Sequence, residues 1–121
     1  MSGGKNILIV EDDDDVRECL AAFLEGEGYR VVEAEDGQQA LVRLRSASDF
    51  CLILLDLFMP VMNGWAFRAE QLRDPALATI PVIVISADAG TPQKATALGA
   101  VDSMVKPIEF DRLLQAVTSY C

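Results

Sequence analysis

Acidic, hydroxyl and basic side chains stand where short apolar runs of this 121-residue chain end. The set consists of Glu11 and Asp12 after Val10, Asp56 after Leu55, Ser86 after Ile85 and Lys106 after Val105. Clustered carboxylates would repel one another, because two unit charges about 4 Å apart cost about 4 kcal/mol at an effective dielectric of about 20. A divalent cation and the ammonium of Lys106 could compensate. Since the ligands are oxygens, without nitrogen or sulfur, the sequence predicts Mg2+ or Mn2+.

This set of side chains suits phosphoryl transfer, in which catalysis consists mainly of positioning and of neutralising the equatorial oxygens. Asp56 could act as the nucleophile and form an acyl phosphate. The metal ion and Lys106 would each hold a phosphoryl oxygen, and Ser86 would donate a hydrogen bond to a third. The sequence therefore predicts Asp56 as a phosphoryl acceptor.

The elements that would position these residues alternate along the chain. Apolar runs typical of buried parallel strands lie at residues 7–10, 31–32, 51–55, 82–85 and 101–105. Segments with helical period separate them. We expect the first helix to end at Gly26 and Gly28, the second to be capped by Asp36, and the third to end before Pro75. The fourth should be capped by Thr91, with Pro92 as its first helical residue, and the fifth should cover residues 110–117.

Five strands alternating with five helices predict an α/β fold, a doubly wound parallel sheet with helices on both faces. Right-handed crossovers leave few topologies, and we expect the strand order 2-1-3-4-5. Sites in such sheets lie beyond the carboxyl ends of the strands, where the order reverses. We expect residues 1–121 to form a single domain, with no output domain encoded.

The charge of the chain limits its partners. A formal net charge of −9 disfavours direct binding to nucleic acid or to an anionic membrane. No histidine is present, which excludes histidine ligands and histidine acid–base catalysis. The start of the chain lacks the apolar stretch of a signal peptide, and no apolar run approaches the ~18 residues of a membrane span.

The cysteines Cys19, Cys51 and Cys121 are odd in number, widely spaced and without a CxxC pair. This pattern argues against a disulfide framework or a zinc site and favours a reducing cytosol. We expect Cys19 and Cys51 to be small core residues. The predicted location is cytoplasmic.

Four stretches together resemble the motif set of the response regulator receiver domain. They are Glu11-Asp12, the run DLFMPVMNG over residues 56–64, Ser86-Ala87 and Lys106-Pro107. The resemblance implies a flavodoxin-like fold, with Asp56 as phosphoacceptor, Ser86 as switch hydroxyl and Lys106 as the lysine of the family. It also implies a Mg2+ site made by Glu11 (mostly through water), Asp12, Asp56 and the main-chain carbonyl of Phe58, and a cis peptide bond before Pro107.

The same resemblance implies partners. A histidine kinase or histidine phosphotransfer protein would donate from phosphohistidine, and the chain would promote only its own phosphorylation and dephosphorylation. An output domain or target would bind the face of the fourth helix, fifth strand and fifth helix. Two positions depart from the family pattern: Ser103 replaces a frequent aromatic residue, and Phe58 is bulky. We therefore expect the response to run through residues 86–90 and the start of the fourth helix at Thr91-Pro92. We also expect dephosphorylation to be slow.

Other interpretations of these residues remain. Asp14 and Asp15 are expected to be solvated anions at a helix N-terminus. A haloacid-dehalogenase type of hydrolase would need an acid where Phe58 stands, and a flavodoxin-like cofactor binder would need a hydroxyl- and glycine-rich loop in place of the aspartates at 12–15. The alternative that stays open is a phosphorylation-independent interaction module.

Overall fold

The computed structural model describes residues 5–121. Residues 1–4, part of the chain start that was expected to lack a signal peptide, lie outside the described part. Its elements are β1 Asn6–Val10, α1 Asp14–Gly26, β2 Arg30–Ala34, α2 Gly37–Ser46, β3 Phe50–Asp56, α3 Gly64–Arg73, β4 Val82–Ser86, α4 Thr91–Ala97, β5 Asp102–Val105 and α5 Phe110–Tyr120. The strands form one sheet in the order β2-β1-β3-β4-β5 with parallel pairing throughout. The predicted flavodoxin-like fold and strand order are confirmed.

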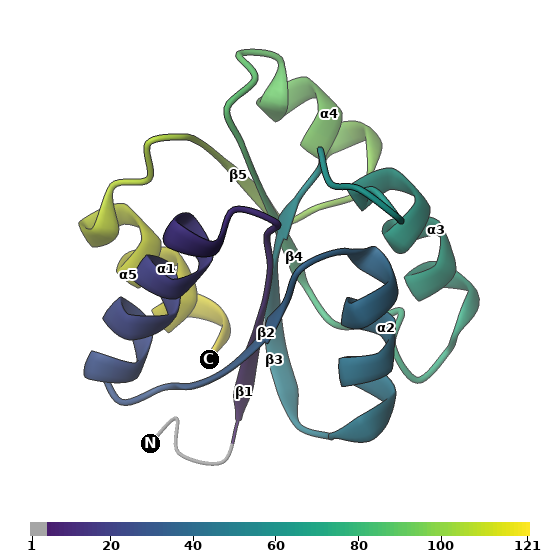
Figure 1. Ribbon diagram of the computed structural model, residues 1–121, viewed down its shortest axis with the longest axis horizontal. Helices are drawn as coiled ribbons and strands as arrows, with labels where there is room; N and C mark the ends of the chain where they lie inside the picture. The colour runs from purple at the N-terminus through teal and green to yellow at the C-terminus, as the bar shows by residue number, and fades with distance from the viewer. Residues whose placement is uncertain (1–4) are drawn as a thin grey trace.

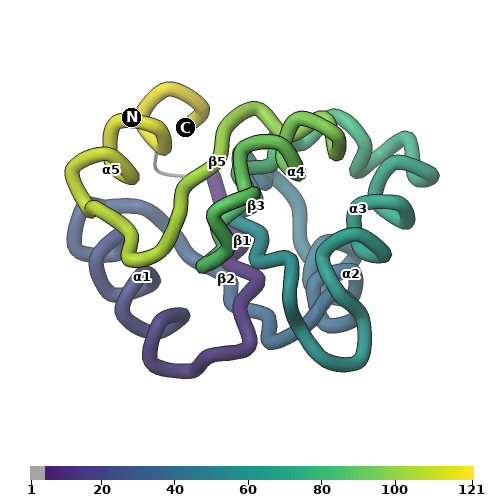
Figure 2. Tube along the Cα trace, turned by 90° about the horizontal axis from the view of Figure 1, so that it is seen from above, coloured from purple at the N-terminus to yellow at the C-terminus, as the bar shows by residue number. Residues whose placement is uncertain are grey.

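Two helical layers cover the sheet (Figure 1). Helices α1 and α5 lie on one face, and α2, α3 and α4 lie on the other, as the view from above also shows (Figure 2). Strand side chains alternate between the faces. Ile7 and Ile9 pack toward α1 and α5, whereas Leu8 and Val10 pack toward the other three helices. All four are fully buried, which is why β1 reads as a continuous apolar run.

The helix starts follow the expected capping chemistry at three places. Asp13, Asp36 and Asn63 accept hydrogen bonds from main-chain N–H groups at the starts of α1, α2 and α3. Asp14 and Asp15 lie in the first turn of α1, where the sequence analysis expected them. These caps set where the loops from β1 and β3 end.

The prediction of Thr91 as a helix cap is wrong by one residue. Gly90 is the N-cap, and Thr91 is the first residue of α4. Thr91 is fully buried, and its hydroxyl donates to the main-chain oxygen of Asp88. Its side chain therefore stabilises the loop before the helix rather than the free N–H groups of the first turn.

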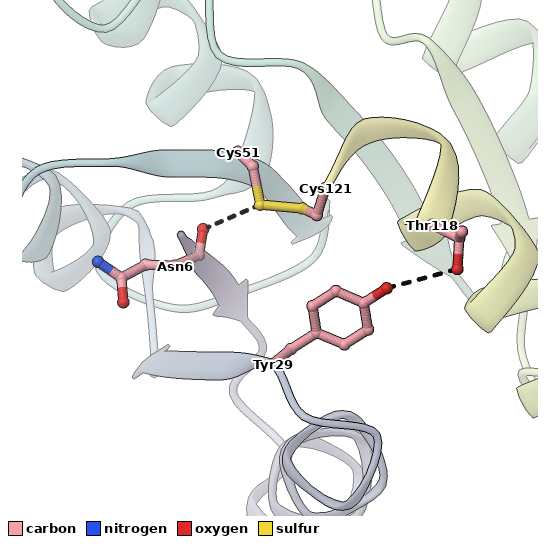
Figure 3. The surroundings of a disulfide bond; sticks show 5 residues. All are labelled: Asn6, Tyr29, Cys51, Thr118 and Cys121. Carbon is pink, nitrogen blue, oxygen red and sulfur yellow. Dashed lines mark hydrogen bonds between the residues drawn. A yellow bond between two sulfur atoms is a disulfide. The ribbon is translucent and has the colours of Figure 1, made fainter. Parts of the chain in front are cut away.

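The cysteine prediction is also wrong. Cys51, at the start of β3, forms a disulfide with Cys121, with the two Cα atoms 5.5 Å apart (Figure 3). Cys51 is buried as expected, but Cys19 is exposed rather than part of the core. The sequence spacing was uninformative because α5 brings Cys121 back across the sheet, 70 residues along the chain. The cysteines therefore no longer favour a reducing compartment.

No helix among residues 5–121 is long and apolar enough to cross a membrane.

Candidate functional site

Polar residues gather at the carboxyl edge of the sheet, as the topology predicts. Glu11 directly follows β1 and Lys106 directly follows β5, whereas Asp56 and Ser86 are themselves the last residues of β3 and β4. The pairing of β3 with β4 places Asp56 opposite Ile85, and the main-chain N–H of Lys106 donates to the main-chain oxygen of Ser86 at 2.8 Å. The main chain thus fixes the separation of the residues before any side-chain contact is made.

Three carboxylates meet at this edge. One oxygen each from Glu11, Asp12 and Asp56 lie within 4.8 Å of one another. Glu11 is fully buried and Asp56 is 4% exposed, while Asp12 is exposed. Partial burial raises the pKa of Asp12, and a hydrogen bond and charge repulsion from Glu11 raise it further. An all-oxygen cluster that disfavours its own negative charge fits a hard divalent cation.

The ammonium of Lys106 partly neutralises the cluster. It forms an ion pair with Glu11, and it lies 3.6 Å from the Oδ2 atom of Asp56. Burial alone would lower the pKa of Lys106, but its hydrogen bond to Glu11 and the charges of Asp56 and Glu11 outweigh burial and raise it. The predicted grouping of Lys106 with the acids is borne out by these contacts.

Arg17 is a second cation beside the cluster, and the sequence analysis missed it. Its side chain is 9% exposed and donates to the main-chain oxygen of Glu11 at 2.9 Å, to Asp14 at 2.7 Å and to Glu33 at 3.1 Å. Burial works to lower the pKa of Arg17, but these carboxylates raise it overall. The sequence did contain a signal for this burial. Arg17 stands three residues before Leu20, on the apolar face of α1, where a charged side chain must be buried with partners.

The loop after β3 closes tightly around Asp56. The main-chain N–H of Phe58 donates to Asp56 Oδ1 at 3.4 Å. A Cβ atom at Gly64 would lie 2.6 Å from the Asp56 main-chain oxygen and 2.8 Å from the Leu57 Cα. Glycine is therefore required at position 64 because the backbone approaches it closely.

Ser86 lies on the opposite side of Asp56 from β1, at the end of β4. It is fully buried, and its Oγ atom accepts a hydrogen bond from the Asp88 N–H at 3.3 Å. The peptide bond between Lys106 and Pro107 is cis, as the resemblance implied. All the side chains predicted for the site thus belong to one edge of the sheet.

Comparison with known proteins agrees with this arrangement. A family model for the response regulator receiver domain matches residues 7–118. The chain belongs to the response regulator receiver family. Receiver domains partner with histidine kinases and are not classical enzymes.

Curated relatives contain this receiver domain within longer proteins. The chain is 38% identical over 116 residues to Response regulator RR06 of Streptococcus pneumoniae, covering 93% of this chain and 51% of that protein. It is 40% identical over 113 residues to the transcriptional regulatory protein ZraR of Escherichia coli K12, covering 89% of this chain and 25% of that protein. The chain therefore spans about half of the first of these relatives and one quarter of the second.

Solved receiver structures share the fold. The chemotaxis protein CheY4 of Vibrio cholerae has a TM-score of 0.86 and 28% identity, covering 97% of this chain and 98% of that one. The response regulator TrrA of Thermotoga maritima, solved in complex with Mg2+-BeF, has a TM-score of 0.84 and 29% identity, covering 97% and 99%. The acidic pocket of Glu11, Asp12 and Asp56 is typical of a phosphoaspartate site in this family.

Proposed function

We propose that Asp56 accepts a phosphoryl group from a phosphohistidine donor in a Mg2+-dependent reaction, and that this switches partner binding. The observation that carries the proposal is the position of the Asp56 carboxylate. It lies within 4.8 Å of the oxygens of Glu11 and Asp12, with the Lys106 ammonium 3.6 Å away. We propose residues 1–121 as a single receiver domain and the cytoplasm as its location.

The reaction would form a bond between an Asp56 carboxylate oxygen and phosphorus. The bond from phosphorus to the donor imidazole would break, and its electron pair would leave on the imidazole nitrogen. Glu11, Asp12, Asp56 and the Phe58 carbonyl would hold Mg2+, which when bound supplies positive charge to the phosphoryl oxygens. The Lys106 ammonium would follow the charge from the Asp56 carboxylate to a phosphoryl oxygen.

Ser86 would report the modification. Its hydroxyl would donate to a phosphoryl oxygen, because a hydrogen bond to an anionic acceptor is stronger than a neutral one. Ser103 lies on β5 and has no ring to turn into the space that Ser86 leaves. The change would therefore pass through the loop that follows Ser86 and the start of α4.

Phosphorylation by a small acyl phosphate tests the proposal. The wild-type protein should gain the mass of one phosphoryl group in Mg2+ but not after chelation, and Asp56→Asn should gain none. Lys106→Ala should reduce the yield more than it reduces stability. Wild-type protein that gains no mass with Mg2+ would instead support a phosphorylation-independent interaction module.

A groove beside the site offers a place for the donor. A cavity of about 290 Å3 between α1 and the segment after β5 is lined mainly by apolar side chains, with Val16, Leu20 and Ile108 among them. Lys106 and the exposed Cys19 also line it. We propose that a histidine kinase or histidine phosphotransfer protein docks here. Alkylation of Cys19 should then slow transfer from a phosphohistidine protein and leave transfer from an acyl phosphate unchanged.

A second surface would carry the output. The face formed by α4, β5 and α5 exposes Val101 and Val105 on or beside its strand. We propose this face for an output domain or target protein, because α4 follows the loop that begins at Ser86. Charge substitution at Val105 should weaken such a contact without changing phosphorylation of Asp56.

A further inference from the structure

One cation links two loops at the rim of the candidate site. The ammonium of Lys94, on α4, forms an ion pair with Asp88 in the loop between β4 and α4. The same nitrogen lies 5.3 Å from the ring centroid of Phe58, in the loop between β3 and α3. Lys94 therefore contacts both of the loops that leave the strands ending at Asp56 and Ser86.

Each contact of Lys94 leads directly to a residue of the site. The main-chain N–H of Phe58 donates to Asp56 Oδ1 at 3.4 Å. The main-chain N–H of Asp88 donates to Ser86 Oγ at 3.3 Å. The two loops are thus bound to the site through their main chains and to each other through Lys94.

The surroundings hold this bridge in place. Phe58 is 54% exposed, and its ring meets the Trp65 ring edge-on, with centroids 5.2 Å apart and planes at 77°. A Cβ atom at position 90 would lie 3.3 Å from Asp88 Oδ2 and 3.8 Å from Lys94 Nζ. The glycine at that position therefore leaves room for the ion pair between α4 and its preceding loop.

We propose that Lys94 is a positioning residue that holds these loops in the unphosphorylated arrangement and so limits the affinity of the site for a phosphoryl group. The inference rests on the function proposed above. When the Ser86 hydroxyl turns to a phosphoryl oxygen, Asp88, two residues further and hydrogen-bonded to Ser86, is drawn with it. Phe58 stays next to the acceptor, so Lys94 must give up one of its two contacts.

The expected effect is modest because the bridge is partly solvated. The Lys94 and Asp88 side chains are 36% and 35% exposed. Exposed ion pairs and exposed cation–π contacts are both weak, and giving up one of them on binding should cost the wild type about two- to fivefold in affinity. High salt should reduce the part that comes from the ion pair.

Beryllofluoride, a stand-in for the phosphoryl group, tests the bridge in the presence of Mg2+. Trp65 is the single tryptophan of the chain and touches Phe58, so its fluorescence can follow the titration. Lys94→Gln should bind beryllofluoride about two- to fivefold more tightly than wild type. Lys94→Arg keeps the cation and should restore wild-type affinity. Arg73→Gln removes an equal charge at the far end of α3, where Arg73 pairs with Glu70, and should leave the affinity unchanged.

A double-mutant comparison separates the bridge from a general charge effect. Phe58→Leu should also tighten binding, and adding Lys94→Gln to it should bring much less than the single change does. Unchanged or weaker binding in Lys94→Gln, full additivity of the two changes, or an equal effect of Arg73→Gln would each overturn the inference. Wild-type protein that binds no beryllofluoride would contradict the proposed function itself, whereas normal wild-type binding with an unaltered Lys94→Gln variant would contradict the bridge alone.

Discussion

Opening the disulfide between Cys51 and Cys121 should lower the stability of the domain substantially. The crosslink closes a loop with a sequence separation of 70 residues. In the chain-entropy treatment, a loop of this length stabilises the folded state by about 4 kcal/mol at 25 °C. Reduction should add little further cost, because the Cys51 sulfur lies 3.5 Å from the Asn6 main-chain oxygen, and the new thiol finds an acceptor there (Figure 3). The loss should therefore approach the entropic value.

Urea unfolding of oxidised and reduced protein measures this loss. With an m value of about 2 kcal/mol per molar urea, reduction should lower the midpoint by about 2 M. Cys121→Ala should unfold like the reduced wild type and ignore the reductant. Cys19→Ala is the matched control, since Cys19 is exposed and unpaired, and it should keep the full response to reductant. Coincident midpoints for oxidised and reduced wild type, or three titratable thiols in the unreduced unfolded protein, would refute the reasoning.

Asp12→Asn should raise the midpoint of urea unfolding in the presence of chelator, because the raised pKa of Asp12 shows that its negative charge is disfavoured there. The same substitution should abolish the stabilisation that Mg2+ gives to the wild-type protein. Arg17→Met should lower stability by about 1–2 kcal/mol and weaken Mg2+ binding, because the Glu11 carbonyl loses its donor, whereas Arg43→Met on the surface of α2 should change neither measurably. Phe58→Asn should shorten the lifetime of the acyl phosphate measured by mass spectrometry, and an unchanged lifetime would show that the ring does not shield the acceptor. Low-salt titration against random duplex DNA should show no binding, given the net charge of −9.

The fold and the main site residues were accessible from the sequence for a geometric reason. Parallel strands buried on both faces give continuous apolar runs, and the residue at each carboxyl end must lie on one edge of the sheet. The positions of Asp56, Ser86 and Lys106 therefore followed from where three runs end. No tertiary contact had to be guessed for that step.

Contacts that depend on side-chain reach or on distant packing were not accessible. Cys121 meets Cys51 only because α5 crosses the sheet in a particular direction. Arg17 stands out on the apolar face of α1, but its hydrogen bond to the Glu11 main-chain oxygen was not visible in the sequence. Thr91 looked like a cap, yet its hydroxyl binds the Asp88 oxygen of the preceding loop instead. Sequence distance concealed the partner of Cys121, whereas Arg17 and Thr91 bind main-chain oxygens only six and three residues earlier, which residue types and spacing do not single out.

The two cations of the site differ in their freedom to move. Arg17 is bound to the main-chain oxygen of Glu11 and to carboxylates on α1 and β2, so it must stay with the loop whatever binds there. Among residues 5–121, the Lys106 ammonium is held only by the side-chain charges of Glu11 and Asp56. A divalent cation among the carboxylates would take over the neutralisation of Glu11, and the ammonium could then follow Asp56 and any group attached to it. Metal and phosphoryl group should therefore favour each other's binding by the same factor, because coupling between two sites is reciprocal.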